Sequence, residues 1–133
     1  MQLLDHVSIT VRDLNLARQF YDAIFKVLGV RKVYDREDAI GYGTRNRKDD
    51  DAHSYLSIYL SSAASADPRR HWCFRAQSAA QVRAFHSAGI AAGGIDAGAP
   101  GLRTDYHAAY FAAFLADPED NRIEAVWHRG QDG

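Results

Sequence analysis

An internal repeat constrains the fold of this chain more than any other feature of its sequence. The stretches HVSITVRDLNLARQFYDAIFKVLG and HWCFRAQSAAQVRAFHSAGIAAGG align without a gap. The alignment places His6 on His71 and Phe20 on Phe85. Self-similarity of this kind is typical of one supersecondary unit that is used more than once. We therefore predict two copies of one structural unit.

Each copy begins with a strand that is followed by a helix. Polar and apolar residues alternate over HVSITV, residues 6–11, which is the period of a strand with two unlike faces. Asp13 and Ser78 can each cap the first backbone N–H groups of a helix, and a glutamine three residues after Ser78 completes a capping-box pattern. Gly29 and Gly89 are predicted to end the two helices.

Shorter strands are predicted after each helix. They run over Arg31 to Tyr34, Ala39 to Tyr42, Tyr55 to Leu60, Tyr110 to Leu115 and Arg122 to Trp127, with a weaker one near Gly93 to Ala97. The order predicts an α+β fold with two sheets, mainly antiparallel, each covered by a helix on one face. The uncovered faces would form a common cavity. The charged segment 46–51, NRKDDD, is predicted to be a solvated loop.

Composition limits the class of protein. The length and the 47% hydrophobic content suit a single domain, 1–133, with module one at 4–62 and module two at 69–128. A formal net charge of -1 gives no basic field for nucleic acid or a membrane surface. The single Cys73 allows no internal disulfide, and we find no signal segment or membrane span in the sequence. We expect a soluble, cytoplasmic protein.

Three side chains of ligand type are predicted to meet in the cavity. Glu124 lies in the apolar run NRIEAVWH, on the opposite strand face from Ile123 and Ala125. If the bulky faces pack on the helices, His6, His71 and Glu124 all project from the sheets into the cavity. Two imidazoles and a carboxylate are the donor set of an open divalent metal site. A metal would also stabilise a charge that is costly to bury alone.

A purely structural alternative exists for the same three residues. The two histidines would then be strand-end residues that are hydrogen-bonded to backbone. Glu124 would form an ion pair with Arg75, Arg122 or Arg103.

The repeat units, the opening DHVSITVRDLNLARQFY, the second HWCFRA and the closing DPEDNRIEAVWH resemble the glyoxalase/bleomycin resistance/extradiol dioxygenase superfamily, also called the vicinal oxygen chelate superfamily. The resemblance runs from about Leu4 to His128. It implies two βαβββ modules with cupped sheets and outer helices, a homodimer, and one divalent metal ion: iron, manganese, zinc, nickel or cobalt. By resemblance, the metal ligands are His6, His71 and Glu124.

Two departures from the family pattern matter. Glyoxalase I enzymes have a further carboxylate on the last strand of module one, where this chain has Tyr59 by the repeat alignment or Ser57 by a slip of two residues. The ligand set therefore looks closer to that of extradiol dioxygenases. The turn DPEDN lacks the usual glycine before its asparagine, but Asp120 and Asn121 both tolerate left-handed backbone.

The segment 98–114, GAPGLRTDYHAAYFAAF, is predicted to form one wall of the cavity. His107 and Tyr110 are candidate catalytic acids, bases or hydrogen-bond donors. The candidate substrate-binding residues are Arg75, Arg103, Tyr106 and Tyr59. The alternative is a surface loop whose aromatic residues cover the edge of the core. The remaining polar residues are expected to have no chemical role. Cys73 is predicted to be a small buried residue, and His128 is predicted to lie at the rim of the cavity. His53 and His86 are predicted to be structural or solvated.

The sequence thus favours a metal-dependent enzyme that acts on a small-molecule substrate with adjacent oxygen atoms, by dioxygenase, lyase or isomerase chemistry. A non-catalytic small-molecule or drug-binding protein is the first alternative. A structural homologue with a filled cavity is the second.

Overall fold

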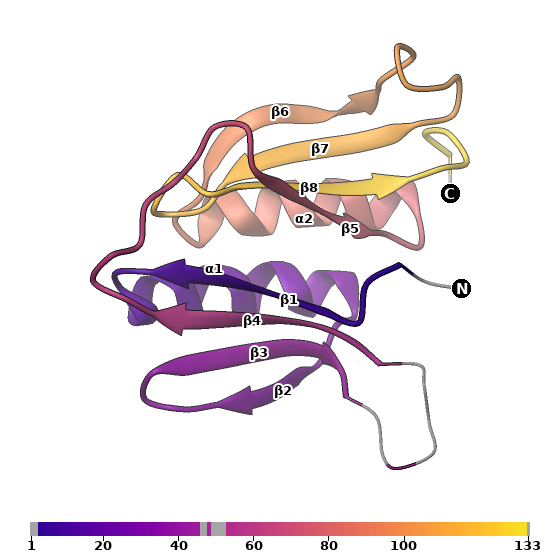
Figure 1. Cartoon of the computed structure of the whole chain (residues 1–133). Helices are drawn as coiled ribbons and strands as arrows, with labels where there is room; N and C mark the ends of the chain where they lie inside the picture. Colours follow the sequence, from indigo (N-terminus) through magenta and orange to yellow (C-terminus); the bar gives the residue numbers. More distant parts are fainter. Residues whose placement is uncertain (1–2, 46–47, 49–52, 133) are drawn as a thin grey trace.

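The computed structural model describes residues 3–45, 48 and 53–132, and it shows the strand–helix–three-strand unit twice (Figure 1). The predicted loop 46–51 lies outside the described residues, apart from Lys48. The elements are β1 (His6–Val11), α1 (Leu14–Leu28), β2 (Lys32–Asp35), β3 (Ala39–Thr44), β4 (Ser54–Leu60), β5 (His71–Arg75), α2 (Ala79–Ala91), β6 (Ile95–Leu102), β7 (Phe111–Ala116) and β8 (Arg122–Trp127).

The two sheets have matching strand orders, β1-β4-β3-β2 and β5-β8-β7-β6. In each sheet the first strand pairs with the last strand of its module in parallel, and the other pairings are antiparallel. Both helices lie on the same side of the molecule, behind the two sheets in Figure 1, and they pack against each other. The predicted fold of two βαβββ modules is confirmed.

Strand β1 shows why one face of each sheet stays open. Ile9 and Val11 are buried on the helix side, whereas His6, Ser8 and Thr10 are exposed on the other side. In β5, likewise, the residues at alternate positions from His71 onward are exposed. The apolar core therefore fills the space between helices and sheets. We call the opposite surface of each sheet its open face.

Both helix starts agree with the sequence. The Asp13 side chain accepts a hydrogen bond from the backbone N–H of Leu16, and Ser78 accepts one from the backbone N–H of Gln81. Gly29 ends α1 in the left-handed conformation, with φ of 74°. The predicted end of α2 at Gly89 is wrong, because the helix continues to Ala91.

Gly89 instead allows close contact between α2 and its sheet. A Cβ atom built at this position would lie 2.3 Å from Leu115 Cδ1, which belongs to strand β7. The strand predicted only weakly near Gly93 to Ala97 is present as β6 and is eight residues long. Its register against β7 shifts on both sides of Gly98.

The turn after β7 connects the two modules. The Tyr21 hydroxyl on α1 donates to the buried Asp117 carboxylate at 2.7 Å. The Glu119 carboxylate accepts from the backbone N–H groups of Arg12 and Asp13, just before α1 begins. Asp120 adopts φ of 68°, so it takes the left-handed position that the sequence predicted for this turn. None of the helices in the described part of the chain is long and apolar enough to cross a membrane.

Candidate metal centre

Glu124 is buried on the open side of module two and lies close to one of the two predicted histidine ligands. Only 3% of Glu124 is exposed, and its Oε1 is 3.3 Å from Nε2 of the half-exposed His71. Strand pairing produces this approach, because β5 and β8 run in parallel with Cys73 opposite Glu124. The structure therefore brings two of the three predicted ligands together.

The arginine ion pairs proposed as an alternative for Glu124 do not form among the described residues. Arg122 pairs with Asp120 at 3.2 Å, and Arg103 donates to the carbonyl of Ala99 at 2.7 Å. Arg75 is exposed and lies near the Cys73 thiol, and it makes no hydrogen bond or ion pair with Glu124 in the described part of the chain. Glu124 is thus left with neutral donors and the His71 imidazole.

Tyr110 holds the second oxygen of Glu124. Its hydroxyl donates to Glu124 Oε2 at 2.5 Å. Burial raises the pKa of Tyr110 well above its ordinary value, and the hydrogen bond to Glu124 raises it further.

Cys73, on the strand next to Glu124, is an exposed residue and not the buried residue that the sequence predicted. Its thiol pKa is nevertheless raised to about 12, first by desolvation and then by the negative charge of Glu124. Tyr110 and Cys73 therefore keep their protons near neutral pH.

The predicted wall residues gather next to this carboxylate. The Tyr106 and Tyr110 rings meet edge to face with centroids 4.8 Å apart. His107 Nε2 lies 3.0 Å from His128 Nδ1, and the backbone N–H of Ala109 donates to His107 Nδ1. In its neutral form His107 must therefore carry its proton on Nε2 and donate to His128. His128 belongs to this group, although the sequence predicted only a position at the rim of the cavity for it.

A pocket of about 330 Å³ opens beside His71, the residue that lies next to Glu124. His71, Tyr106, Phe114 and Arg122 are among its lining residues. Arg103, predicted to bind substrate, packs with its guanidinium carbon 5.4 Å from the centre of the Phe114 ring. The pocket therefore joins the candidate ligand His71 to one predicted substrate-binding residue, Tyr106.

His6 lies elsewhere in the chain. Strands β1 and β5 run in opposite directions in Figure 1, so the two strands start at opposite ends of the molecule. His6 is the first residue of β1 and His71 is the first residue of β5. Among the described residues, the group with metal-ligand spacing that contains His6 consists of Asp5, His6 and His53. The three-ligand set of His6, His71 and Glu124 does not form within one chain. It stays a prediction for an assembly of two chains.

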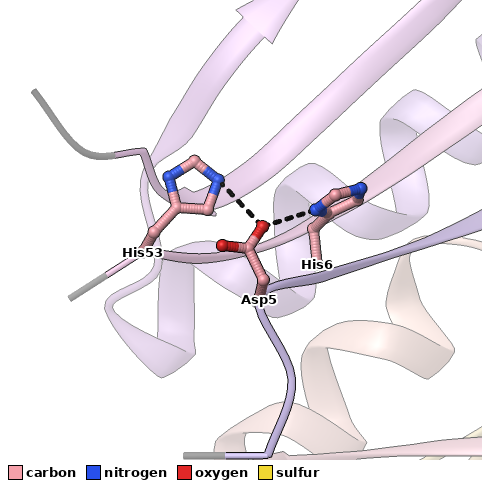
Figure 2. A group of neighbouring side chains, drawn as sticks. All are labelled: Asp5, His6 and His53. Carbon is pink, nitrogen blue, oxygen red and sulfur yellow. Dashed lines mark hydrogen bonds and ion pairs between the residues drawn. The ribbon is translucent and has the colours of Figure 1, made fainter. Parts of the chain in front are cut away.

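Figure 2 shows the group of Asp5, His6 and His53. Asp5 Oδ1 lies 2.5 Å from His6 Nδ1 and 3.4 Å from His53 Nε2, so both rings point toward one carboxylate oxygen. Sequence reasoning missed Asp5 and treated His53 as structural or solvated. The sequence does show that Asp5 and His6 are neighbours, which could have indicated a pair of ligands. The approach of His53 to Asp5 depends on the parallel pairing of β1 with β4, which the sequence does not show.

Strand register also identifies the module-one equivalent of Glu124. Cys73 pairs with Glu124, and the corresponding residue of β1, Ser8, pairs with Ser57. Of the two alternatives in the sequence, Ser57 is therefore the equivalent position and Tyr59 is not. Ser57 is buried and lies 2.6 Å from the Tyr34 hydroxyl. Tyr59 is 43% exposed and lies close to the same tyrosine.

Comparisons with known proteins agree with this fold. The model of the family described as Glyoxalase/Bleomycin resistance protein/Dioxygenase superfamily matches residues 3–125. A glyoxalase/bleomycin resistance protein from Albidiferax ferrireducens T118 is 30% identical, with a TM-score of 0.79 over 94% of this chain and 98% of that one. A search of curated proteins returned no match.

Two more distant structures share the fold. A glyoxalase-related enzyme from Fulvimarina pelagi is 18% identical, with a TM-score of 0.69 over 100% of this chain and 96% of that one. A glyoxalase/bleomycin resistance protein/dioxygenase family enzyme from Burkholderia phytofirmans PsJN is 21% identical, with a TM-score of 0.66 over 92% and 95%.

Proposed function

Because the chain belongs to the Glyoxalase/Bleomycin resistance protein/Dioxygenase superfamily, we propose that it is a metal-dependent enzyme that acts on a small substrate with adjacent oxygen atoms. The metal ligands are His71 and Glu124 of one chain and His6 of a second copy. The observation that carries this proposal is the buried Glu124 carboxylate, 3.3 Å from an exposed imidazole that faces a pocket.

The residues present fit a divalent ion. A buried carboxylate needs a partner of opposite charge or a full set of hydrogen bonds, and no arginine or lysine among the described residues pairs with Glu124. Imidazole nitrogen and carboxylate oxygen are ligands that zinc, iron, nickel, cobalt and manganese accept. When bound, such an ion would supply Lewis-acid polarisation of the oxygens of the substrate.

The opposite positions of His6 and His71 support a site that is assembled from two chains. In a two-fold symmetric dimer, the same surface of each copy meets the other, so one contact produces two equivalent sites. Both open faces carry exposed side chains with large apolar surfaces that a second copy can cover, and Tyr59 and Ile95 are 43% and 62% exposed. We therefore propose a homodimer in which each cavity combines module one of one chain with module two of the other.

The remaining site residues receive roles from their contacts. Tyr110 orients Glu124 through its hydroxyl, and its raised pKa keeps it a donor at neutral pH. His107, paired with His128 at the pocket edge, can exchange a proton at Nε2 with a bound substrate. Substrate contacts are assigned to Arg75, Arg103, Tyr106 and Tyr59, the last contributed with His6 by the second chain.

The test is metal affinity, measured by titration with Zn²⁺ against a competing chelator. We expect tight binding by the wild-type chain and a large loss of affinity in His71→Ala and in Glu124→Gln, with thermal unfolding to show that the variants fold. His86→Gln is the matched control, because it alters another histidine–carboxylate pair, the one with Asp96 at 2.9 Å. Equal affinity in all four proteins would exclude the proposed ligands.

The choice among reactions needs a second assay. Oxygen consumption with a panel of catechols, after loading with Fe²⁺ or Mn²⁺, is expected only from a dioxygenase. Tight metal binding without oxygen consumption would favour lyase or isomerase chemistry. A folded wild-type protein that binds none of the candidate ions would leave the non-catalytic drug-binding alternative.

A further inference from the structure

We infer that Asp5, His6 and His53 form a separate divalent metal site that lies entirely within one chain. The site does not depend on the proposed function, since it uses neither His71 nor Glu124 and needs no second copy. It shares one residue with the proposed inter-chain site, the imidazole of His6.

The donor atoms already converge on one point. Asp5 Oδ1 is 2.5 Å from His6 Nδ1 and 3.4 Å from His53 Nε2, and all three donor atoms lie within 4.8 Å of one another. Zinc bound to nitrogen and oxygen at 2.0–2.2 Å in a tetrahedron separates its ligands by about 3.3 Å. Small rotations of the three side chains therefore suffice to place one ion between them (Figure 2).

The backbone holds these side chains in register. Asp5 and His6 stand at the start of β1, and His53 stands directly before β4. The two strands are parallel neighbours with His6 opposite Tyr55, and the Tyr55 N–H donates to the carbonyl of Asp5 at 3.2 Å. The ligands therefore come from the adjoining ends of two paired strands, the kind of support that a binding site requires.

Ring packing limits the rotation of both imidazoles. The His6 ring stacks on Tyr55, with centroids 5.0 Å apart and planes 12° apart. The His53 ring meets the same tyrosine edge to face, with centroids 4.7 Å apart. Tyr55 thus acts as a common platform that keeps one nitrogen of each ring directed at Asp5.

The chemistry of the donors defines the class of ligand. Two imidazoles and one carboxylate suit Zn²⁺, Ni²⁺, Co²⁺ and Cu²⁺ more than Mg²⁺ or Ca²⁺, which prefer oxygen. The side chains of Asp5 and His6 are 65% and 51% exposed, so water can complete the coordination sphere. His6 uses Nδ1 in this site and would use its other nitrogen in the inter-chain site. Binding both at once requires an imidazolate, so we treat the two sites as alternatives for His6.

The test removes the inter-chain ligands first. In the double variant His71→Ala, Glu124→Gln, we expect one residual Zn²⁺ per chain, weaker than in the wild type. Adding His53→Gln to that variant is expected to abolish the residual ion, and Asp5→Asn is expected to do the same. Adding His86→Gln is the control and is expected to leave it in place. Calorimetry gives the stoichiometry, and Co²⁺ absorbance reports the coordination.

Two results would overturn the inference, and neither bears on the proposed function. One is a folded double variant that binds no Zn²⁺ at stoichiometric concentration. The other is a residual ion that persists unchanged after His53→Gln and Asp5→Asn. The proposed function fails on a different result, namely wild-type affinity in the double variant itself.

Discussion

At the scale of single residues, Glu124 has a polar environment that suits a bound cation. Tyr110 and Cys73 keep their protons, because burial and the nearby carboxylate raise both of their pKa values. Tyr110 therefore donates to one oxygen of Glu124, and the other oxygen faces His71. Hydrogen bonds of this kind orient metal ligands, and their loss weakens metal binding by about 10- to 100-fold in known sites.

Tyr110→Phe tests this arrangement. The substitution removes the donor to Glu124 Oε2 and leaves a buried carboxylate oxygen with one fewer partner, which costs about 1–3 kcal/mol of folding stability. We expect lower thermal stability of the metal-free protein and weaker Zn²⁺ binding. Tyr106→Phe is the control, because Tyr106 is 64% exposed and its hydroxyl forms no hydrogen bond with the described residues. A Tyr110→Phe protein as stable as Tyr106→Phe would contradict the role assigned to this hydrogen bond.

At the scale of secondary-structure elements, helix α2 shows where local preference gives way to packing. A glycine near the end of a helical pattern normally predicts a helix end. Gly89 lies inside the helix because a side chain there would meet Leu115 of β7 and approach Ile24 and Phe20 of the core. The close contact between α2 and β7 requires a glycine at position 89. This contact joins residues that are far apart in the sequence, so the local pattern around Gly89 does not reveal it.

Gly89→Ala should therefore destabilise the protein. The exchange favours an isolated helix by about 1 kcal/mol, but forcing a methyl group into a filled core costs about 1–3 kcal/mol. We expect a lower melting temperature and a loss of stability in chemical denaturation. Ser87→Ala, on the exposed side of the same helix, provides the control and should be neutral or slightly stabilising. Stabilisation of both variants would show that the sheet can move away from α2.

An ion-pair network between α1 and β2 predicts a pH dependence. Hydrogen bonds from Lys32 and then Arg18 lower the pKa of Asp35 below its ordinary value of 3.8. A carboxylate with a lowered pKa stabilises the folded state above its ordinary value and loses that contribution as pH falls through the folded value. Asp35→Asn should flatten the acid side of the stability curve below about pH 4. Urea unfolding of the wild type and the variant between pH 2 and 7 measures this, and parallel pH profiles would contradict it.

The same scale shows how much of the fold was readable from the sequence. Asp13, Ser78 and Gly29 act locally on the first and last turns of helices, so their roles could be predicted. Strand β6 was predicted only weakly, because IDAGAPGL lacks alternation and its pairing with β7 shifts register at its glycine positions. A strand of this kind is specified by its neighbour more than by its own side chains.

At the scale of the whole molecule, the sequence predicted two ligand-type residues that the structure brings together, but not the strand arrangement on which the proposed sharing between chains depends. The repeat and strand parity identified His71 and Glu124, which the structure brings to 3.3 Å. The association of Asp5 with His53, and the separation of His6 from His71, depend on strand pairing and on how the modules pack. Neither can be derived from spacing along the chain.

Complementation between inactive variants tests the proposed assembly. One chain carries His6→Ala, the other carries His71→Ala with Glu124→Gln, and both carry His53→Ala to remove the in-chain site. Each protein alone should lack tight Zn²⁺ binding, because its homodimers contain no complete ligand set. Co-refolded mixtures should regain one tight site per mixed dimer, measured by chelator competition. Mixed dimers that regain no tight site would show that the ligands are not shared between chains.

The two modules share an architecture but differ in charge at the equivalent positions Glu124 of module two and Ser57 of module one. In the proposed dimer, every cavity is bounded by an acidic wall from one subunit and a hydroxyl-bearing wall, with Ser57, Tyr34 and Tyr59, from the other. The two sides of such a cavity therefore differ in charge. A molecule whose two oxygens are chemically unlike would enter it in a single orientation, so the reaction should be regioselective even before any side chain is tuned to a particular substrate.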